Sequence, residues 1–214
     1  AQTMAVWGKG LLESRYGVPL EEIEWVQAGV NQPGRREHVD AKPPSKIRIT
    51  RASNRSLNEM LTAGELDAVL SARPPAAFKR SVRRLFENAP SVEESWWRET
   101  GLFPLKHLVV LSRDVNERHP WGAANLYRAF EEARRRSISR LFSDAITYFP
   151  LPWAVDHAAR SSELFGAEYW PYGVEKNRAV LERFLHFARA QGICQNEIGP
   201  EDLFPPTLLE SYRS

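Results

Sequence analysis

The stretch LFPLKHLVVLSRDVNERHPW, residues 102–121, decides the fold. Its continuous apolar run at 109–111 consists of strand formers, a pattern typical of a strand that is covered on both faces. A turn over 114–120 follows, and Pro120 suits the first turn of the long helix that comes next, where its missing N–H costs nothing. His107 stands inside the predicted strand, so its imidazole either supports a core or contacts a ligand.

Length and composition narrow the class of protein. The 214 residues suffice for one large domain or two modest lobes. The 29 basic and 27 acidic residues nearly balance, which does not favour a nucleic-acid-binding surface. The basic run 134–136 has Glu131 and Glu132 beside it and is interpreted as a solvated helix face. With one cysteine, Cys194, the chain forms no intramolecular disulfide and no thiolate metal cluster. It has no run of 18 apolar residues, so no membrane span is expected.

The first part of the chain alternates predicted helices and strands. A helix over 3–16 begins with Thr3 as its N-cap, and Gly17 ends it. Two short strands are predicted at 24–27 and 46–50, and the residues between them, 31–45, are predicted to form a surface loop.

A second helix and a third strand come next. Ser56 and Glu59 form a capping box, and the helix that they open ends at Gly64. A strand over 66–70 follows, and the chain then turns sharply at 71–75. The alternation of helix and strand predicts the α/β class with a parallel, doubly wound sheet.

Beyond Pro120 the pattern becomes helical. One predicted helix has an apolar face that packs on a core, formed by Leu126, Phe130, Ala133 and Leu141. Further helices are predicted over 153–165 and 175–191. The aromatic link over 169–173 either packs as a corner, which we favour, or walls a pocket for an aromatic ligand.

Two places suit the binding of a carboxylate. The helix start at Gln2 and Thr3 offers free amides and the positive end of the helix dipole, although an ordinary N-cap has the same residues. Ser71 and Arg73 follow a predicted strand at its carboxyl end, where α/β sheets bind ligands. The guanidinium of Arg73 could hold a carboxylate through two parallel hydrogen bonds, or it could be a plain surface arginine.

Other kinds of site receive little support from the sequence. No two histidines have the four-residue spacing of a helical metal pair, so no metal site is expected. A phosphate-binding loop, a dinucleotide-binding glycine motif and a nucleophile elbow are also missing from the sequence.

Five motifs in order closely resemble the 4,5-dihydroxyphthalate decarboxylase family. They are QTMAVW (2–7), SLNEMLTAGELDAVLSARPP (56–75), GLFPLKHLVVLSRDVNERHPW (101–121), YWPYGVEKNR (169–178) and EDLFPPTLLES (201–211). The resemblance implies the two-lobed fold of type 2 periplasmic substrate-binding proteins. It also implies that the chain lacks the family's N-terminal part. A helix that starts at Thr3 without a strand before it agrees with that expectation.

The resemblance further implies a division of the chain and a set of roles. Residues 1–104 would be the second α/β lobe without its first strand, and 105–214 the hinge strand and the C-terminal helical part that completes the first lobe. Substrate contacts would be Gln2, Thr3, Ser71 and Arg73, and His107 would serve in proton transfer.

The implied reaction converts 4,5-dihydroxyphthalate to 3,4-dihydroxybenzoate and carbon dioxide, in the catabolism of phthalate, without a metal or organic cofactor. The expected partner is a small aromatic dicarboxylate, a homo-oligomer is possible, and the cytoplasm is the expected compartment. The alternative is a non-catalytic, periplasmic substrate-binding protein of a transporter for a small carboxylate. The same fold and anion contacts would serve that function.

Overall fold

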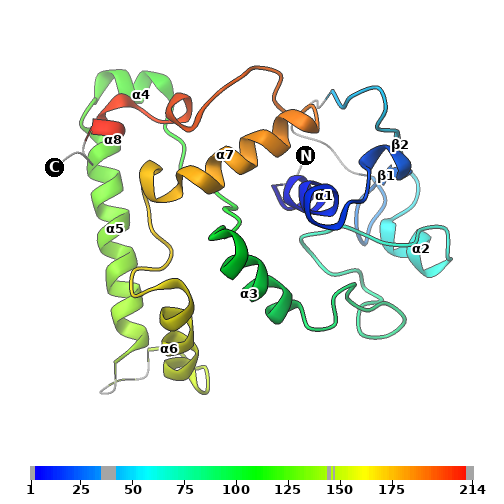
Figure 1. Ribbon diagram of the computed structural model, residues 1–214, viewed down its shortest axis with the longest axis horizontal. Helices are drawn as coiled ribbons and strands as arrows, with labels where there is room; N and C mark the ends of the chain where they lie inside the picture. The colour runs from blue at the N-terminus through cyan, green and yellow to red at the C-terminus, as the bar shows by residue number, and fades with distance from the viewer. Residues whose placement is uncertain (1–2, 35–41, 144–145, 147, 211–214) are drawn as a thin grey trace. The chain divides into compact units, whose positions relative to one another are not determined.

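The computed structural model describes residues 3–34, 42–143, 146 and 148–210 (Figure 1). The chain divides into two compact units. The first unit comprises Ala1–Lys106 with Glu182–Glu197, and the second comprises His107–Leu181 with Ile198–Ser214. Helix α7 (Val174–Ala190) contributes its first part to the second unit and its last part to the first. The lobe boundaries given above stay a prediction.

The sheet of the first unit is small. Strand β1 (Trp25–Gln27) pairs in parallel with β2 (Ile49–Arg51), and Trp25 lies opposite Ile49. Besides the last part of α7, this unit contains the helices α1 (Thr3–Tyr16), η1 (a 3-10 helix, Leu20–Glu22), α2 (Leu57–Thr62) and α3 (Ala89–Thr100). This mixture of helices with a small parallel sheet is compatible with the predicted α/β class.

Trp7 of α1 lies at the centre of the core of the first unit. Its side chain is 3% exposed, and its ring centroid lies 5.7 Å from those of both Phe184 and Phe187. The ring of Trp96, on α3, approaches edge-on at 6.4 Å. The indole Nε1–H donates a hydrogen bond of 3.1 Å to the carbonyl of Leu105, so the one polar group of the ring is satisfied.

The last part of α7 lies against α1 within the same unit. Gln191, which follows α7 and is buried, donates through Nε2 to the carbonyl of Val6 at 2.8 Å. Gly10 of α1 faces Phe187 so closely that a Cβ on Gly10 would lie 2.3 Å from the phenyl ring. Glycine at position 10 therefore sets how near the two helices lie.

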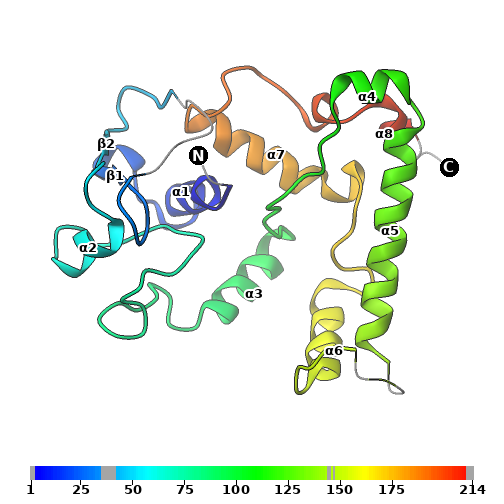
Figure 2. The same ribbon diagram turned by 180° about the vertical axis from the view of Figure 1, so that it is seen from behind.

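The second unit is helical. Its elements, seen from two sides in Figures 1 and 2, are α4 (Arg113–Arg118), α5 (Gly122–Leu141), α6 (Ala154–Phe165), the first part of α7, η2 (Pro200–Leu203) and α8 (Pro206–Glu210). Helix α5 contacts both α6 and α8.

Arg134 of α5 corrects the interpretation of 134–136 as a wholly solvated face. Its side chain is 8% exposed, and it forms an ion pair with Glu131 while donating to the carbonyl of Tyr169 at 3.1 Å. These partners compensate the burial of the guanidinium. Arg135 and Arg136 are exposed and pair with Glu132, as a solvated face requires.

Several elements predicted from local patterns are confirmed. The helix over 3–16 ends at Gly17, whose φ of +63° is the left-handed conformation that glycine adopts without strain. The capping box of Ser56 and Glu59 is present at the start of α2. Helices α6 and α7 lie within one residue of their predicted bounds. The strand predicted over 24–27 is β1.

The predicted strand around His107 is wrong. Residues 101–112 have no regular secondary structure, and 106–110 are exposed, with Val110 at 84%. The strand over 66–70 is wrong for the same physical reason: a strand exists only with a hydrogen-bonded neighbour, and the described residues give neither segment one. The turn over 114–120 is mostly the short helix α4, and Pro120 precedes α5 instead of lying in its first turn.

Two further predictions need adjustment, and one helix was missed. The strand placed at 46–50 is β2, shifted toward 49–51. The apolar face predicted on α5 is only half covered, because Leu126 and Phe130 stay about 40% exposed while Ala123 and Arg134 are buried. Helix α3 was not predicted, although its N-cap Asn88, a proline in its first turn and Gly101 at its end were all visible signals. Part of the predicted loop, 35–41, lies outside the described residues.

None of the helices in the described part of the chain is both long enough and apolar enough to cross a membrane.

Replacing Gly10 by alanine tests the contact between α1 and α7. Phe187 is 4% exposed and is packed against Trp7, so its ring cannot retreat from an added Cβ. We expect Gly10→Ala to lower the free energy of unfolding by about 1–3 kcal/mol, as overpacking of a core does. Urea denaturation measures the change. Gly122→Ala is the matched control, because its Cβ would meet only the Cβ of His119, at 3.8 Å. A Gly10→Ala protein as stable as the wild type would contradict this packing.

Candidate functional site

Helix α2 is the element on which the candidate site of the first unit is built. The side chain of Ser56 accepts a hydrogen bond from the backbone N–H of Glu59 at 3.2 Å. The carboxylate of Glu59 in return accepts from the backbone N–H of Ser56 at 2.7 Å and from its hydroxyl at 2.9 Å. These hydrogen bonds lower the pKa of Glu59, the backbone one most. The helix start is therefore fixed by reciprocal hydrogen bonds.

In the turn that carries the two predicted contacts, Arg73 is exposed and Ser71 is half-buried. The hydroxyl of Ser71 accepts a hydrogen bond of 3.2 Å from the backbone N–H of Arg73, so the two predicted substrate contacts lie together in one turn. Among the residues that the structure describes, no carboxylate forms an ion pair with Arg73.

Two asparagines that the sequence interpretation missed form hydrogen bonds with the backbone just after Arg73. Asn31 donates through Nδ2 to the carbonyl of Pro74 at 3.2 Å and accepts through Oδ1 from the N–H of Ala76 at 2.8 Å. Asn58 of α2 accepts from the N–H of Ala77 at 2.9 Å. Nothing in the sequence signals these contacts, because they join residues 19 to 45 positions apart without a periodic pattern.

The helix start proposed as the second anion contact is only partly described. Thr3 is the first helical residue of α1, not the residue before the helix, and it is half-buried. Gln2 lies outside the described residues. Helix α1 lies near the Ser71 turn, because Leu70, the residue before Ser71, is the nearest side chain to Gly8.

His107 lies in the second unit, in the exposed irregular segment described above. Of the two alternatives for its imidazole, support of a core is wrong, because 106–110 are exposed. An exposed imidazole can exchange protons with a ligand or with water. Its role in proton transfer stays a prediction.

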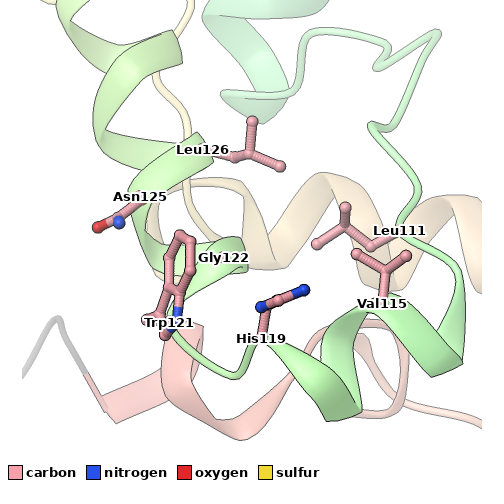
Figure 3. Close-up of a pocket in the computed structure, with 7 residues that line it drawn as sticks. All are labelled: Leu111, Val115, His119, Trp121, Gly122, Asn125 and Leu126. Atoms are coloured by element: carbon pink, nitrogen blue, oxygen red, sulfur yellow. The ribbon is translucent and has the colours of Figure 1, made fainter.

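A hollow between α4 and α5 is a separate feature of the second unit (Figure 3). It has a volume of about 360 Å³ and is lined chiefly by Leu111, Val115, Trp121 and Leu126, with His119 and Asn125 as its polar side chains. Figure 3 shows His119 and Trp121 beside each other, with ring centroids 5.6 Å apart. None of the described residues that line it is lysine or arginine, so it does not suit a dianion, whose desolvation would go uncompensated.

The aromatic link contributes both a packed corner and an exposed ring. Tyr169 is buried, and the ring of Tyr172 lies 6.2 Å from that of Phe130, which agrees with the favoured packed corner. Trp170 is exposed and has a φ of +59°. Asn177 holds the link by donating to the carbonyls of Pro171 and Gly173, both at 2.8 Å.

Lys9 is a half-buried cation of the first unit that the sequence interpretation also missed. Its Nζ lies 4.4 Å from the centre of the Trp25 ring, a cation–π contact that favours the charged amine. Burial acts in the opposite direction and lowers the pKa of Lys9. We assign it a packing role between α1 and β1. The described residues hold no group of three or more His, Cys, Asp or Glu side chains arranged to bind a metal ion.

Comparison with known proteins gives two relatives. A 4,5-dihydroxyphthalate decarboxylase of Comamonas testosteroni is 33% identical over 215 positions, which cover 99% of this chain and 65% of the relative. A protein of the same name from Pseudomonas putida is 31% identical over 100 positions, covering 45% of this chain and 39% of the relative. No family model matches the chain.

Both relatives carry the name of a decarboxylase, and the alignment with the first one covers 99% of this chain. The chain is similar to proteins named 4,5-dihydroxyphthalate decarboxylase. It spans 65% of the length of the relative from Comamonas testosteroni.

The capping box makes a testable statement about pH. The pKa of Glu59 is lowered in the folded protein, so its stabilising effect is present above the ordinary range of a glutamate and is lost as pH falls through the folded pKa. Glutamine can accept the same hydrogen bonds without the charge. We expect the wild type to be more stable than Glu59→Gln at neutral pH, and the difference to vanish in acid.

Urea midpoints of both proteins across a pH series measure this difference. Glu21→Gln, which changes an exposed glutamate of η1, is the control and should show no such trend. A stability difference that grows as the pH falls would contradict the role of the Glu59 charge.

Proposed function

We propose that the protein decarboxylates 4,5-dihydroxyphthalate to 3,4-dihydroxybenzoate and carbon dioxide. The observation that supports this most is the match of 99% of the chain, at 33% identity, to a relative of that name. The exposed guanidinium of Arg73, without a carboxylate partner among the described residues, agrees with an aromatic dicarboxylate as substrate.

The chemistry asks three things of the protein. A ring hydroxyl para to the departing carboxylate supplies electron density to the carbon that bears it. A general acid protonates that carbon, and the ring briefly loses its aromaticity. The C–C bond then breaks, carbon dioxide leaves, its bonding electrons restore the aromatic ring, and the phenol regains its proton. The protein must hold the carboxylate that stays, donate one proton to the ring carbon, and assist the loss and return of the phenolic proton.

The residues divide these tasks in our proposal. Arg73, with Ser71 beside it, holds the remaining carboxylate, the start of α1 at Thr3 adds helix-dipole stabilisation, and Gln2, which lies outside the described residues, adds a further contact. His107 donates the proton to the ring carbon, because imidazole exchanges protons near neutral pH. The proposal includes the two-lobed fold of type 2 periplasmic substrate-binding proteins, with residues 1–104 in one lobe and 105–214 completing the other.

Arg73→Ala tests the anchor. In the protein of full natural length, we expect the KM for 4,5-dihydroxyphthalate to rise about 10- to 100-fold, the value of hydrogen bonds to a charged group. Carbon dioxide release measures the rate. Arg80→Ala, an exposed arginine of the same unit, is the control and should leave the KM unchanged. A wild type that binds the substrate with saturation but releases no carbon dioxide would overturn the enzymatic function and favour a transporter-binding protein.

His107→Ala tests the proton-transfer step. We expect kcat to fall about 100-fold or more, within the range of general acid–base catalysis, while the KM changes little. Steady-state rates of carbon dioxide release give both constants. The control is His157→Ala, an exposed histidine on α6. Unchanged turnover of His107→Ala would remove His107 from the mechanism and leave the anchor untouched.

A further inference from the structure

The backbone directly after Arg73 is fixed by side chains of two other segments. Asn31, which follows β1, uses both ends of its amide, donating to the carbonyl of Pro74 and accepting from the N–H of Ala76. Asn58, on α2, accepts from the N–H of Ala77. Three hydrogen bonds of 2.8 to 3.2 Å therefore hold three of the four residues 74–77, which have no regular secondary structure.

The two asparagines are themselves held by one short piece of backbone. The N–H of Leu57 donates to the carbonyl of Gly29, and the N–H of Asn58 donates to the carbonyl of Val30, both at 2.8 Å. These carbonyls immediately precede Asn31. The segment after β1 thus receives the first amides of α2 and also carries one of the two asparagines.

Gly29 makes this arrangement possible. A Cβ at position 29 would lie 2.1 Å from the carbonyl oxygen of Gln32, a distance that no side chain tolerates. The backbone therefore folds tightly over 29–32, and this bend presents Asn31 to the turn. We name the set of Asn31, Asn58 and the backbone of 29–30 the asparagine clamp.

We propose that Asn31 and Asn58 are positioning residues that place Arg73 for its carboxylate ligand; this inference rests on the proposed function. The clamp contacts the chain one to four residues after Arg73. On the N-terminal side, the hydroxyl of Ser71 accepts a hydrogen bond from the backbone N–H of Arg73. The backbone of Arg73 is consequently ordered before a ligand binds, and only its side chain loses freedom on binding. Ordering in advance increases affinity because less entropy is lost in the complex.

A double-mutant cycle tests the clamp, with phthalate as the probe. Phthalate has the two neighbouring carboxylates but lacks the ring hydroxyls that the proposed decarboxylation needs, so calorimetry on the protein of full natural length reports binding alone. We expect Asn31→Ala to weaken phthalate binding about 5- to 10-fold, the net value of a typical hydrogen bond. In an Arg73→Ala background the same substitution should change the Kd by less than about twofold, because the coupled group is already gone.

Two further variants complete the experiment. Asn58→Ala should behave like Asn31→Ala in both backgrounds. It replaces Asn31→Ala in the cycle if Asn31→Ala folds poorly. Asn54→Ala, an exposed asparagine of the same unit, is the matched control and should leave the Kd unchanged. Urea denaturation of each variant verifies that the native state is populated in the calorimeter.

The outcomes separate this proposal from the proposed function. Equal losses of affinity from Asn31→Ala in both backgrounds would show a merely structural role and overturn the clamp. The clamp would also be overturned if Asn31→Ala and Asn58→Ala bound phthalate as tightly as the wild type. The same holds if Arg73→Ala bound phthalate unchanged, or if the wild type did not bind phthalate. If the cycle shows coupling but the wild type releases no carbon dioxide from 4,5-dihydroxyphthalate, the clamp stands and the decarboxylase function fails.

Discussion

The first amides of α2 have to find acceptors, and this requirement organises the candidate site. A helix begins with backbone N–H groups that have no partner within the helix. In this chain the amides of Leu57 and Asn58 donate to the carbonyls of Gly29 and Val30, directly after β1. The helix is thereby joined to the strand by backbone alone, and the Ser56 capping box satisfies the amide of Glu59. The position of the Arg73 turn depends on this joint through Asn58 and Asn31.

What the sequence could predict is what is decided locally. The capping box, the left-handed glycine that ends α1, and the bounds of α6 and α7 follow from neighbouring residues, and each is present. The strand around His107 failed because strand propensity reports packing and pairing with neighbours more than a preference of the backbone. Val110 has the composition of a covered strand residue, yet it is 84% exposed and has no ladder partner in the described chain.

In the candidate site, too, the features decided locally could be predicted and those that depend on distant partners could not. The place of Ser71 and Arg73 in a sharp turn followed from the sequence, and the structure brings the two together through a 3.2 Å hydrogen bond. The roles of Asn31 and Asn58 did not follow, because an amide that bonds to backbone 19 to 45 positions away leaves no periodic signal. The burial of Arg134 was missed for a related reason: the carbonyl of Tyr169 that compensates it is 35 positions distant.

The chemistry of decarboxylation itself argues for which carboxylate an arginine should hold. The departing carboxylate loses its negative charge to the ring as carbon dioxide forms, so a cation paired with it would stabilise the ground state more than the transition state and slow the reaction. The carboxylate that stays keeps its charge throughout, and a cation holds it equally well at every stage. A guanidinium on a turn ordered beforehand, the role that we propose for Arg73, therefore suits the remaining carboxylate. The departing group needs surroundings with little positive charge.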